Sequence, residues 1–420
     1  MQIGMGRGLS VFMLAAGLVV PGFAAAQAAA PQPPMQWVGS WAASQQIPEP
    51  QNALPVQDLQ DATLRELVHL SVGGELVRVY LSNAFGLGPL HITAAHIAVP
   101  VSPAAAKVDT ATDHALTFNG RADVTIPPGA EYISDPVAFH AAALSNLAVT
   151  LHVDQAPARQ TGHPGSHADS YVLHGDHVAE ADLPGAKMVE HWYMLAGVDV
   201  ATSSAPDAVV TLGDSITDGH GSTLNGNNRW PDDLAARLQA SAATQNIGVL
   251  NEGIGGNRLL LYGLGPDALA RFDSDVLAQA GVRTLIVLEG VNDLGVLTHD
   301  HDVPAAEHAA MVQNILGAYQ QIITRAHAHG IRVIGATILP YQGSDYYHPG
   351  PASEADRQAI NAWIRTPGHF DAVVDFDQIT RDPAHPAQLL PAYDSGDHLH
   401  PSPAGYKAMA DAIPLDQLTR

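Results

Sequence analysis

One serine of this chain stands where a nucleophile would be presented. Ser215 follows a run of β-branched and apolar residues, 209–212, that stops at Gly213. A buried strand that ends in this way delivers the next side chains to the carboxyl edge of a sheet, where α/β proteins place their chemistry. Glycine at position 213 lets the chain turn sharply without a Cβ clash. We therefore expect Ser215 to be a nucleophile.

The base that such a serine needs is offered by residues 397–401, Asp-His-Leu-His-Pro. A serine hydroxyl is a poor nucleophile unless an oriented histidine takes its proton. Asp397 and His400 are three residues apart in a loop, so the carboxylate can reach Nδ1 of the imidazole while Nε2 points toward Ser215. His398 is the alternative base, but its side chain should face away from the acid. Since the chain has 22 histidines, position rather than abundance favours His400.

Hydrogen-bond donors for a developing oxyanion follow two further strand patterns. The loop 251–257 is rich in glycine, so its backbone N–H groups can approach a ligand closely. Asn292 follows the next strand pattern and offers its side-chain amide at the same edge of the sheet. Together with the N–H of Ser215 these groups make three donors, and one such donor typically stabilises a transition state by about 2.7–4 kcal/mol. The set is suited to acyl transfer.

The elements that must position these residues alternate between strand and helix from residue 207 onward. Alternation on this scale predicts a parallel sheet with helices on both faces. The expected strands cover residues 207–212, 247–251, 284–288, 333–337 and 372–376, and the expected helices cover 232–240, 266–279, 305–329, 354–365 and 403–413.

The stretch 37–201 has a different pattern, of short β segments separated by turn residues. Residues 67–72 and 76–81 alternate on either side of two glycines, which predicts a hairpin. Several strands without long helical periods predict an antiparallel β-sandwich of jelly-roll type. Further strands are expected at 91–99, 115–118, 123–126, 147–153 and 192–200.

The beginning of the chain has the pattern of an export signal. A single early charge, Arg7, precedes the apolar run 9–20 and a group of small residues. The apolar run is too short for a membrane span. We therefore expect a secreted or periplasmic protein once the signal is removed. The expected boundaries are 1–26 for the signal, 27–36 for a leader, 37–201 for the front domain, 202–206 for a linker and 207–420 for the second domain.

The composition excludes several classes of protein. The formal net charge of -23 argues against binding to nucleic acid or to anionic membrane surfaces. No other stretch reaches the length of a membrane span, so no membrane insertion is expected. The chain has no cysteine, which excludes disulfides and thiolate metal sites. An uncharged ester suits this acidic protein better than a polyanion does.

Four sequence blocks of the second domain resemble those of the SGNH, or GDSL-type, ester hydrolases. In order they are Gly213-Asp214-Ser215-Ile216-Thr217, the glycine loop that ends at Gly256, Gly290-Val291-Asn292-Asp293 and Asp397-His398-Leu399-His400. One block alone would be a weak signal, but four in order, each at an expected strand end or loop, are specific. The Gly-x-Ser-x-Gly elbow of the ordinary α/β-hydrolase fold is absent.

The resemblance implies a flavodoxin-like, three-layer α/β/α domain that needs no cofactor. It implies that Ser215 is the nucleophile, His400 the base and Asp397 the residue that orients the base. Ser215, Gly256 and Asn292 would then form the oxyanion hole. Gly256 is matched in preference to Gly255 because a polar residue, Asn257, occupies the position that follows the family's glycine.

The resemblance extends to the front domain and indicates a substrate class. Residues 37–44 and 79–86 resemble a subgroup of secreted two-domain esterases that are often associated with xylan-degrading systems and described as aryl- or acetylesterases. This implies a serine esterase for small-molecule or polysaccharide esters, above all acetyl esters of plant polysaccharide. A lipid-directed acylhydrolase, with the apolar run 259–262 as a lid, is the alternative. A non-catalytic carbohydrate-binding protein is disfavoured because no catalytic residue is missing.

Several polar residues near the nucleophile have two interpretations. Asp214, Asn257, Arg258 and Asp293 are candidates for contacts with substrate, although Asp214 is expected first of all to hydrogen-bond the turn backbone and Asp293 to hold its loop. Arg258 is equally suited to a structural ion pair. Residues 299–302, His-Asp-His-Asp, alternate as zinc or calcium ligands do. A solvated loop is favoured there, and no metal is expected.

Overall fold

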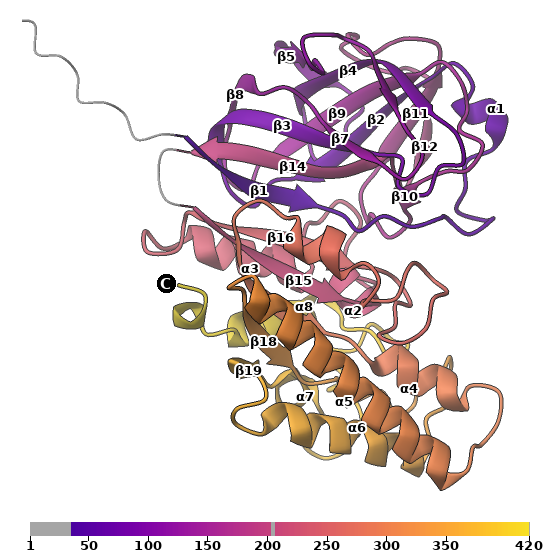
Figure 1. The fold of residues 1–420 in the computed structure, drawn as a ribbon, viewed down its shortest axis with the longest axis vertical. Helices are drawn as coiled ribbons and strands as arrows, with labels where there is room; N and C mark the ends of the chain where they lie inside the picture. Colours follow the sequence, from indigo (N-terminus) through magenta and orange to yellow (C-terminus); the bar gives the residue numbers. More distant parts are fainter. Residues whose placement is uncertain (1–34, 203–205, 420) are drawn as a thin grey trace, which may run out of the picture. The chain divides into compact units, whose positions relative to one another are not determined.

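The computed structural model describes residues 35–202 and 206–419 of the chain, and one compact unit begins at Met35. The export signal expected over 1–26 lies outside the described residues and stays a prediction. Among the described residues, no helix combines the length and the apolar character that crossing a membrane requires. Antiparallel sheets precede a parallel sheet along the chain (Figure 1).

Residues 36–202 form a sandwich of two antiparallel sheets with a common hydrophobic core. The strands β1 (Gln36–Ala42), β14 (Leu195–Thr202), β3 (Gly74–Ser82) and β7 (Glu131–Ile133) lie in this order in one sheet, with β8 (Val137–Ala141) also paired to β3. The second sheet has the order β12 (Lys187–Val189), β11 (Ser170–His174), β2 (Ala62–His69), β9 (Asn146–Val153), β4 (Leu90–Pro100) and β5 (Val108–Ala115), with β6 (Val124–Ile126) paired to β4. Outside these sheets lie the paired strands β10 (Gly162–His163) and β13 (Trp192–Tyr193) and the helix α1 (Val56–Leu59).

The hairpin expected from residues 67–72 and 76–81 is wrong. β2 pairs with β9 and β11, whereas β3 pairs with β14, β7 and β8, so the two segments belong to different sheets. Their connection crosses the sandwich. The alternation of residues is the same in a hairpin and in such a crossing. It does not reveal which strands the two segments pair with, because those strands lie far away along the chain. The strand expected over 115–118 is also wrong for the most part, since β5 ends at Ala115.

Residues 207–419 contain the parallel sheet that the alternation of strand and helix predicts. Its strands are β15 (Asp207–Gly213), β16 (Ile247–Gly253), β17 (Val282–Leu288), β18 (Arg332–Ala336) and β19 (Ala372–Val374). They run parallel in the spatial order β16-β15-β17-β18-β19. This order is that of flavodoxin-like folds, in which the ligand crevice opens at the carboxyl ends of the first and third strands. Those strands are β15 and β17.

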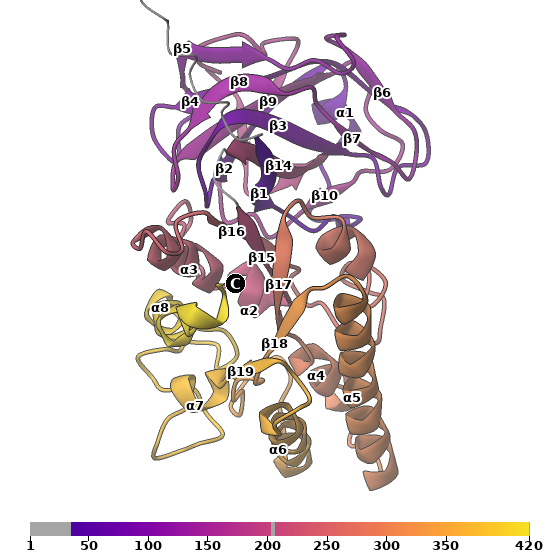
Figure 2. The same ribbon diagram turned by 60° about the vertical axis from the view of Figure 1, so that its left-hand side comes forward.

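Helices cover both faces of the parallel sheet. In Figure 2, α3 and α8 lie to the left of the sheet and α5 lies to its right. The helices are α2 (Ser215–Asp218), α3 (Trp230–Gln239), α4 (Val291–Thr298), α5 (Ala305–Ala328), α6 (Pro351–Arg365), α7 (Phe376–Thr380) and α8 (Pro403–Ala412), followed by a 3₁₀ turn at Leu415–Gln417.

The helix expected over residues 266–279 is wrong except for one π-helical turn, Asp273–Leu277. The start of this segment is bonded to a neighbouring loop rather than to itself, because Asn257 Nδ2 donates to the carbonyl oxygen of Pro266 at 2.8 Å. The guanidinium of Arg271 is then buried among the strand ends. Tertiary hydrogen bonds have replaced the helix that the local pattern favours.

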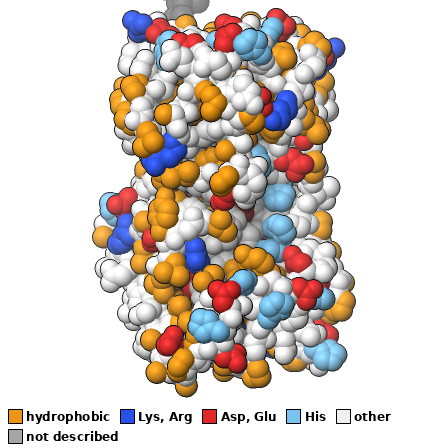
Figure 3. All heavy atoms as spheres, turned by 90° about the vertical axis from the view of Figure 1, so that its right-hand side faces the viewer, with side chains coloured by type: hydrophobic (Ala, Val, Ile, Leu, Met, Phe, Trp, Pro, Cys, Tyr) orange, Lys and Arg blue, Asp and Glu red, His pale blue; other side chains and the backbone are white. Residues whose placement is uncertain are grey.

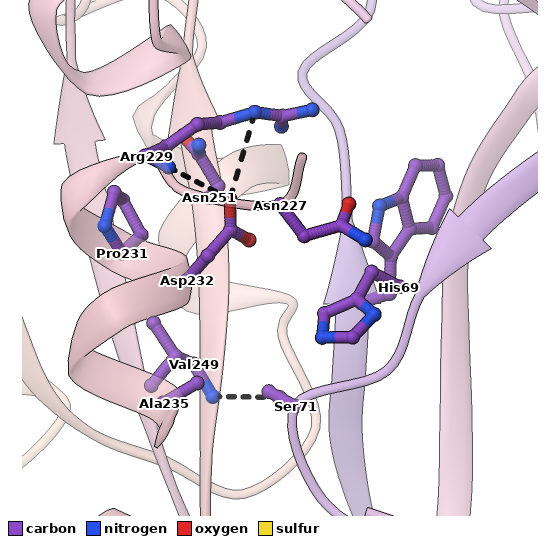
Figure 4. A pocket seen from close by; sticks show the side chains of 10 residues that line it. His69, Ser71, Asn227, Arg229, Pro231, Asp232, Ala235, Val249 and Asn251 are labelled. Carbon is purple, nitrogen blue, oxygen red and sulfur yellow. Dashed lines mark hydrogen bonds and ion pairs between the residues drawn. The ribbon is translucent and has the colours of Figure 1, made fainter. Parts of the chain in front are cut away.

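The antiparallel and parallel parts pack directly against each other. A Cβ at Gly39 of β1 would lie only 2.6 Å from Leu250 Cδ1 of β16. The N–H of Val249 donates to Ser71 Oγ at 2.9 Å (Figure 4). Beside this contact a cavity of about 20 Å³ remains, which is room for about one water molecule and not for a substrate. Because one hydrophobic cluster runs through both parts, the division into two domains at 202–206 stays a prediction.

Candidate active site

The turn that carries Ser215 is built tightly. Every residue of β15 is buried, and a Cβ at Gly213 would lie 2.1 Å from Thr217 Oγ1, so glycine alone fits there. Asp214 caps helix α2, because its Oδ1 accepts the N–H of Ile216 at 2.9 Å. Ser215 is the first residue of α2 and comes two positions after Gly213, the last residue of β15.

Ser215 and His400 meet although 185 positions separate them. Ser215 Oγ lies 2.8 Å from His400 Nε2, and His400 Nδ1 lies 2.6 Å from Asp397 Oδ2. The other oxygen of Asp397 accepts the backbone N–H groups of Leu399 and His400 at 2.9 and 2.8 Å. Because the carboxylate accepts a hydrogen bond from the N–H at Nδ1, Nε2 is left as the acceptor that faces the serine hydroxyl. This chain of hydrogen bonds can turn the hydroxyl into a nucleophile.

The carboxyl of Asp397 stays ionised in this arrangement. Burial raises the pKa of Asp397, but the hydrogen bonds from the side chain and the backbone of His400 outweigh burial and hold that pKa well below its usual range. An ionised carboxylate stabilises the imidazolium that forms when His400 takes a proton. His398 is directed elsewhere, since its Nδ1 lies 2.5 Å from Asp394 Oδ2.

Ser215, His400 and Asp397 line a cavity of about 660 Å³ together with Gly256 and Asn292. The structure therefore brings together all five residues for which the sequence predicts catalytic and oxyanion roles, while the roles themselves stay predictions. The other residues that line the cavity are His220, Gly255, Leu264, Ser344, Asp345, Tyr346, Tyr347, Gly396 and Leu399.

The amide of Asn292 is held in one orientation. The hydroxyl of Tyr347 donates to Asn292 Oδ1 at 2.7 Å, and Asn292 Nδ2 donates to the carbonyl oxygen of Asn257 at 2.8 Å. An amide nitrogen carries two protons, so a second one remains for a ligand. Sequence reasoning missed Tyr347, because its contact with Asn292 is made only by the fold.

The four residues proposed for substrate contacts, Asp214, Asn257, Arg258 and Asp293, do not line this cavity. Asp293 is buried, and its two oxygens accept the backbone N–H groups of residues 259–260 at 2.9 and 3.1 Å. Asn257 is buried as well and donates to two backbone carbonyls of the loop that follows it. Asp214, Asn257 and Asp293 thus hold the loops around the nucleophile in place.

Arg271 is a second residue that sequence reasoning missed. It is buried, and it joins two strand ends: Nη2 donates to the carbonyl oxygen of Gly213 at 3.0 Å, and Nη1 donates to that of Glu252 at 2.7 Å. Its Nε also donates to Asn257 Oδ1 at 3.0 Å. The local signal is a pair with Asp275 at i, i+4, which in an expected helix indicates an ordinary surface ion pair. The sequence alone therefore gives it no special role.

His163 of the antiparallel part reaches the nucleophile helix. Its Nε2 lies 2.9 Å from Asp218 Oδ1, and its Nδ1 lies 2.9 Å from the carbonyl oxygen of Ser44. Asp218 is the last residue of α2, three positions after Ser215. This contact joins segments 55 positions apart, and no spacing motif announces it.

Three buried carboxyl groups lie around the nucleophile turn. Burial raises the pKa of Asp214 to about 7 and that of Asp293 to about 6, and it raises the pKa of Glu289 well above its ordinary value. Arg271 Nη2 lies 3.5 Å from Glu289 Oε1 and offsets part of the negative charge. The raised pKa values reduce the negative charge near the place where an oxyanion would develop.

Comparison with known proteins gives a family match for the parallel part. Residues 211–408 match the model of the GDSL-like Lipase/Acylhydrolase family. Among curated proteins none matches the chain.

Solved structures resemble about half of the chain. A protein from Desulfitobacterium hafniense DCB-2 that is described as a lipolytic protein of the G-D-S-L family is 25% identical, with a TM-score of 0.37, over 49% of this chain and 96% of that protein. A GDSL-like lipase from Bacteroides thetaiotaomicron VPI-5482 is 21% identical, with a TM-score of 0.36, over 50% of this chain and 87% of that protein. An acetyl xylan esterase from Geobacillus stearothermophilus is 22% identical, with a TM-score of 0.37, over 50% of this chain and 94% of that protein.

Proposed function

We propose that this chain, whose residues 211–408 belong to the GDSL-like lipase/acylhydrolase family, is an exported serine esterase that removes short acyl groups from plant polysaccharide. The chain is a carboxylic ester hydrolase by its family. The proposal adds the catalytic residues, the acyl and alcohol parts of the substrate, and export. The observation that carries it is the chain of hydrogen bonds from Ser215 through His400 to Asp397, with contacts of 2.8 and 2.6 Å.

The reaction follows from the direction of the hydrogen bonds that link Ser215, His400 and Asp397. Ser215 Oγ attacks the ester carbonyl while His400 Nε2 takes the hydroxyl proton, and Asp397 stabilises the resulting imidazolium. The N–H groups of Ser215 and Gly256 and the amide of Asn292 donate to the oxyanion. His400 then gives its proton to the leaving alcohol, and an acyl-enzyme remains. Water activated by the same imidazole releases the acid.

The residues that line the cavity are consistent with the proposal of a polyhydroxylated substrate with a short acyl group. Ser344, Asp345 and His220 offer hydrogen bonds, and Tyr346, whose side chain is largely exposed, offers a flat apolar face. A few polar groups beside an apolar surface are what fixes the orientation of a small polar ligand. We propose acetylated plant polysaccharide as the substrate class on this ground and on the subgroup resemblance of the front domain.

The alternative, a lipid-directed acylhydrolase, has less support. The apolar run 259–262 would have to serve as its lid, but Leu259 is buried in the core and its N–H donates to Asp293 at 2.9 Å. Leu261 and Tyr262 are exposed and do not line the cavity of Ser215. A segment anchored in this way is unsuited to swing over a lipid chain.

The nucleophile is tested with the Ser215→Ala variant. Hydrolysis of a chromogenic acetate should fall on the order of 10⁴-fold or more, by analogy with the removal of other catalytic serines. Ser241→Ala, in the turn that follows α3 and outside the cavity, is the matched control and should keep the native rate. Equal rates for native protein and Ser215→Ala would refute the assignment.

The substrate class is tested by a side-by-side assay of acetylated xylan, acetylated pectin and a phospholipid. The proposal expects acetate release from a polysaccharide and little fatty acid from the phospholipid, and the reverse order would establish the lipid alternative. Export is tested in bacteria that express the full chain, where the mature protein should be found outside the cytoplasm without residues 1–26.

A further inference from the structure

We propose that His220, Asp397 and His400 form a binding site for zinc or a similar divalent transition-metal ion, and that the ion bound there reversibly inhibits the enzyme. The proposal rests on the proposed function only in taking His400 as the catalytic base. It concerns a ligand of the same cavity that the esterase reaction does not need.

The three side chains already have the spacing of metal ligands. One donor atom from each lies within 4.8 Å of the others. His220 Nε2 lies 3.8 Å from Asp397 Oδ2, and the ring centroids of His220 and His400 are 4.1 Å apart. Two ligand atoms of a tetrahedral zinc ion with bonds of about 2.1 Å lie about 3.4 Å apart. Since the donor atoms lie at most 4.8 Å apart, side-chain adjustments of up to about 1.4 Å would complete the site.

The backbone holds His220 in position for this contact. Its N–H donates to the carbonyl oxygen of Ser215 at 2.9 Å, and its own carbonyl oxygen accepts the hydroxyl of Tyr406 at 2.6 Å. The imidazole itself is 58% exposed toward the cavity that the three residues line, so an ion can reach it without any opening of the core.

The donor set selects the class of ion. Two imidazoles and one carboxylate, with a fourth position open to solvent, are the ligands of many zinc sites. Ions that prefer oxygen ligands, such as Mg²⁺, find only one suitable donor here. The inference is therefore limited to zinc and its neighbours in the first transition row.

The protein is rich in histidine, but the described residues contain no second cluster with the spacing of metal ligands. Figure 3 shows a face on which several histidine side chains lie among acidic ones. Among residues 35–202 and 206–419, however, His220, Asp397 and His400 are the only group of three potential ligands with this spacing. The segment 299–302, with its alternating histidines and aspartates, joins only His299 and Asp300, at 2.9 Å.

Inhibition follows from the chemistry of one imidazole. A neutral imidazole has one lone pair for a ligand or a proton, and its other nitrogen carries the ring proton. If the ion takes Nε2 of His400, that nitrogen can no longer accept the proton of Ser215. If the ion takes Nδ1, the ring proton moves to Nε2, with the same result. In both cases the serine loses its base.

The activity test is a zinc titration of chromogenic acetate hydrolysis, with each protein normalised to its own zinc-free rate. Native protein should be inhibited, and EDTA should restore the rate, while Mg²⁺ should have no effect. His220→Phe keeps a ring beside His400 but removes one ligand, so its half-inhibiting zinc concentration should rise by at least about 100-fold, beyond the usual effect of losing an outer partner. His327→Phe is the matched control, because His327 also pairs with an aspartate, Asp371, at 2.8 Å. This variant should be inhibited like native protein.

A direct binding measurement separates this proposal from the proposed function. Ser215→Ala should bind one Co²⁺ with the visible absorption of a four- or five-coordinate ion, and Ser215→Ala combined with His220→Phe should not. Equal inhibition of His220→Phe and native protein, absence of inhibition, inhibition that EDTA does not reverse, or equal Co²⁺ binding by the two variants would each overturn the metal site. An active Ser215→Ala protein would overturn the proposed function, while the Co²⁺ spectra would still decide the metal site.

Discussion

Two His–Asp pairs meet the nucleophile helix α2 at its two ends, with the same kind of hydrogen bond in opposite surroundings. The side chains of His400 and Asp397 are 11% and 41% exposed, whereas those of His163 and Asp218 are 3% and 5% exposed. Their N···O distances are 2.6 and 2.9 Å. Pairing with a carboxylate is therefore common to both histidines and does not by itself make one of them a base.

The difference lies in the second ring nitrogen. In His400 that nitrogen faces the hydroxyl of Ser215, so a proton can enter on one side while the carboxylate holds the other. In His163 the second nitrogen faces the carbonyl oxygen of Ser44, which only accepts. His163 thus fixes Asp218 and the end of α2 to the antiparallel part. We infer that one pair serves the reaction and the other serves the position of the helix.

Replacement of His400 should have the largest effect on the rate. His400→Ala should lower kcat for a chromogenic acetate on the order of 10⁴-fold or more, because the serine loses its only base. His398→Ala is the matched control: it removes a neighbouring histidine that is also bonded to an aspartate, and it should keep most of the activity. A similar loss in both variants would mean that disturbance of the loop, not loss of the base, explains the result.

Replacement of His163 should act on stability more than on rate. His163→Ala leaves Asp218 buried without the imidazole that it is bonded to, and breaking a buried pair in this way typically lowers the free energy of unfolding by about 3–5 kcal/mol. Denaturant unfolding measures this change, while kcat of the folded variant should fall far less than in His400→Ala. Addition of Asp218→Asn should recover part of the stability, because no ionised group is then left buried. A variant with native stability and the kcat of His400→Ala would contradict the distinction between the two pairs.

The sequence predicted the parallel sheet and the residues at its strand ends because both signals are local. The apolar run before Gly213 and the alternation of strands and helices are set by burial, which each segment shows by itself. The meeting of Ser215 and His400 follows from the same logic, since parallel strands place their carboxyl ends at one edge. The short spacing of Asp397 and His400 completed the prediction.

What the sequence did not predict depends on contacts between distant segments. The segments 67–72 and 76–81 have hairpin alternation, yet their partners lie in two different sheets. Arg271 resembles a helical surface residue until its guanidinium is seen to join two strand ends. His163 is one of many histidines until the fold brings it to Asp218. In each case the local pattern fits two structures, and tertiary packing decides between them.

A smaller effect, on the pH dependence of stability, distinguishes the buried side of the nucleophile turn from its exposed side. Burial raises the pKa of Asp214 to about 7, whereas an aspartate of the unfolded chain titrates near 3.9. The folded protein therefore binds this proton more tightly, and the stability that results is fully present below about pH 4 and is lost as the pH rises toward about 7. The effect of Asp397 on stability has the opposite sign. Its pKa is lower in the folded than in the unfolded chain, so its contribution to stability is fully present above the pKa of the unfolded chain and is lost as the pH falls toward the pKa of the folded chain.

Asp214→Asn tests this assignment, since the amide oxygen can still accept the N–H of Ile216 while the titration is removed. Unfolding free energies measured between pH 4 and 7 should fall less steeply with pH in Asp214→Asn than in native protein. Asp397→Asn is the control, and between pH 5 and 7 it should not flatten the slope as Asp214→Asn does, because the carboxyl of Asp397 is ionised there in both the folded and the unfolded chain. Equal slopes for native protein and Asp214→Asn would show that the carboxyl of Asp214 is already ionised at pH 4, so that the turn carries a full negative charge beside the serine.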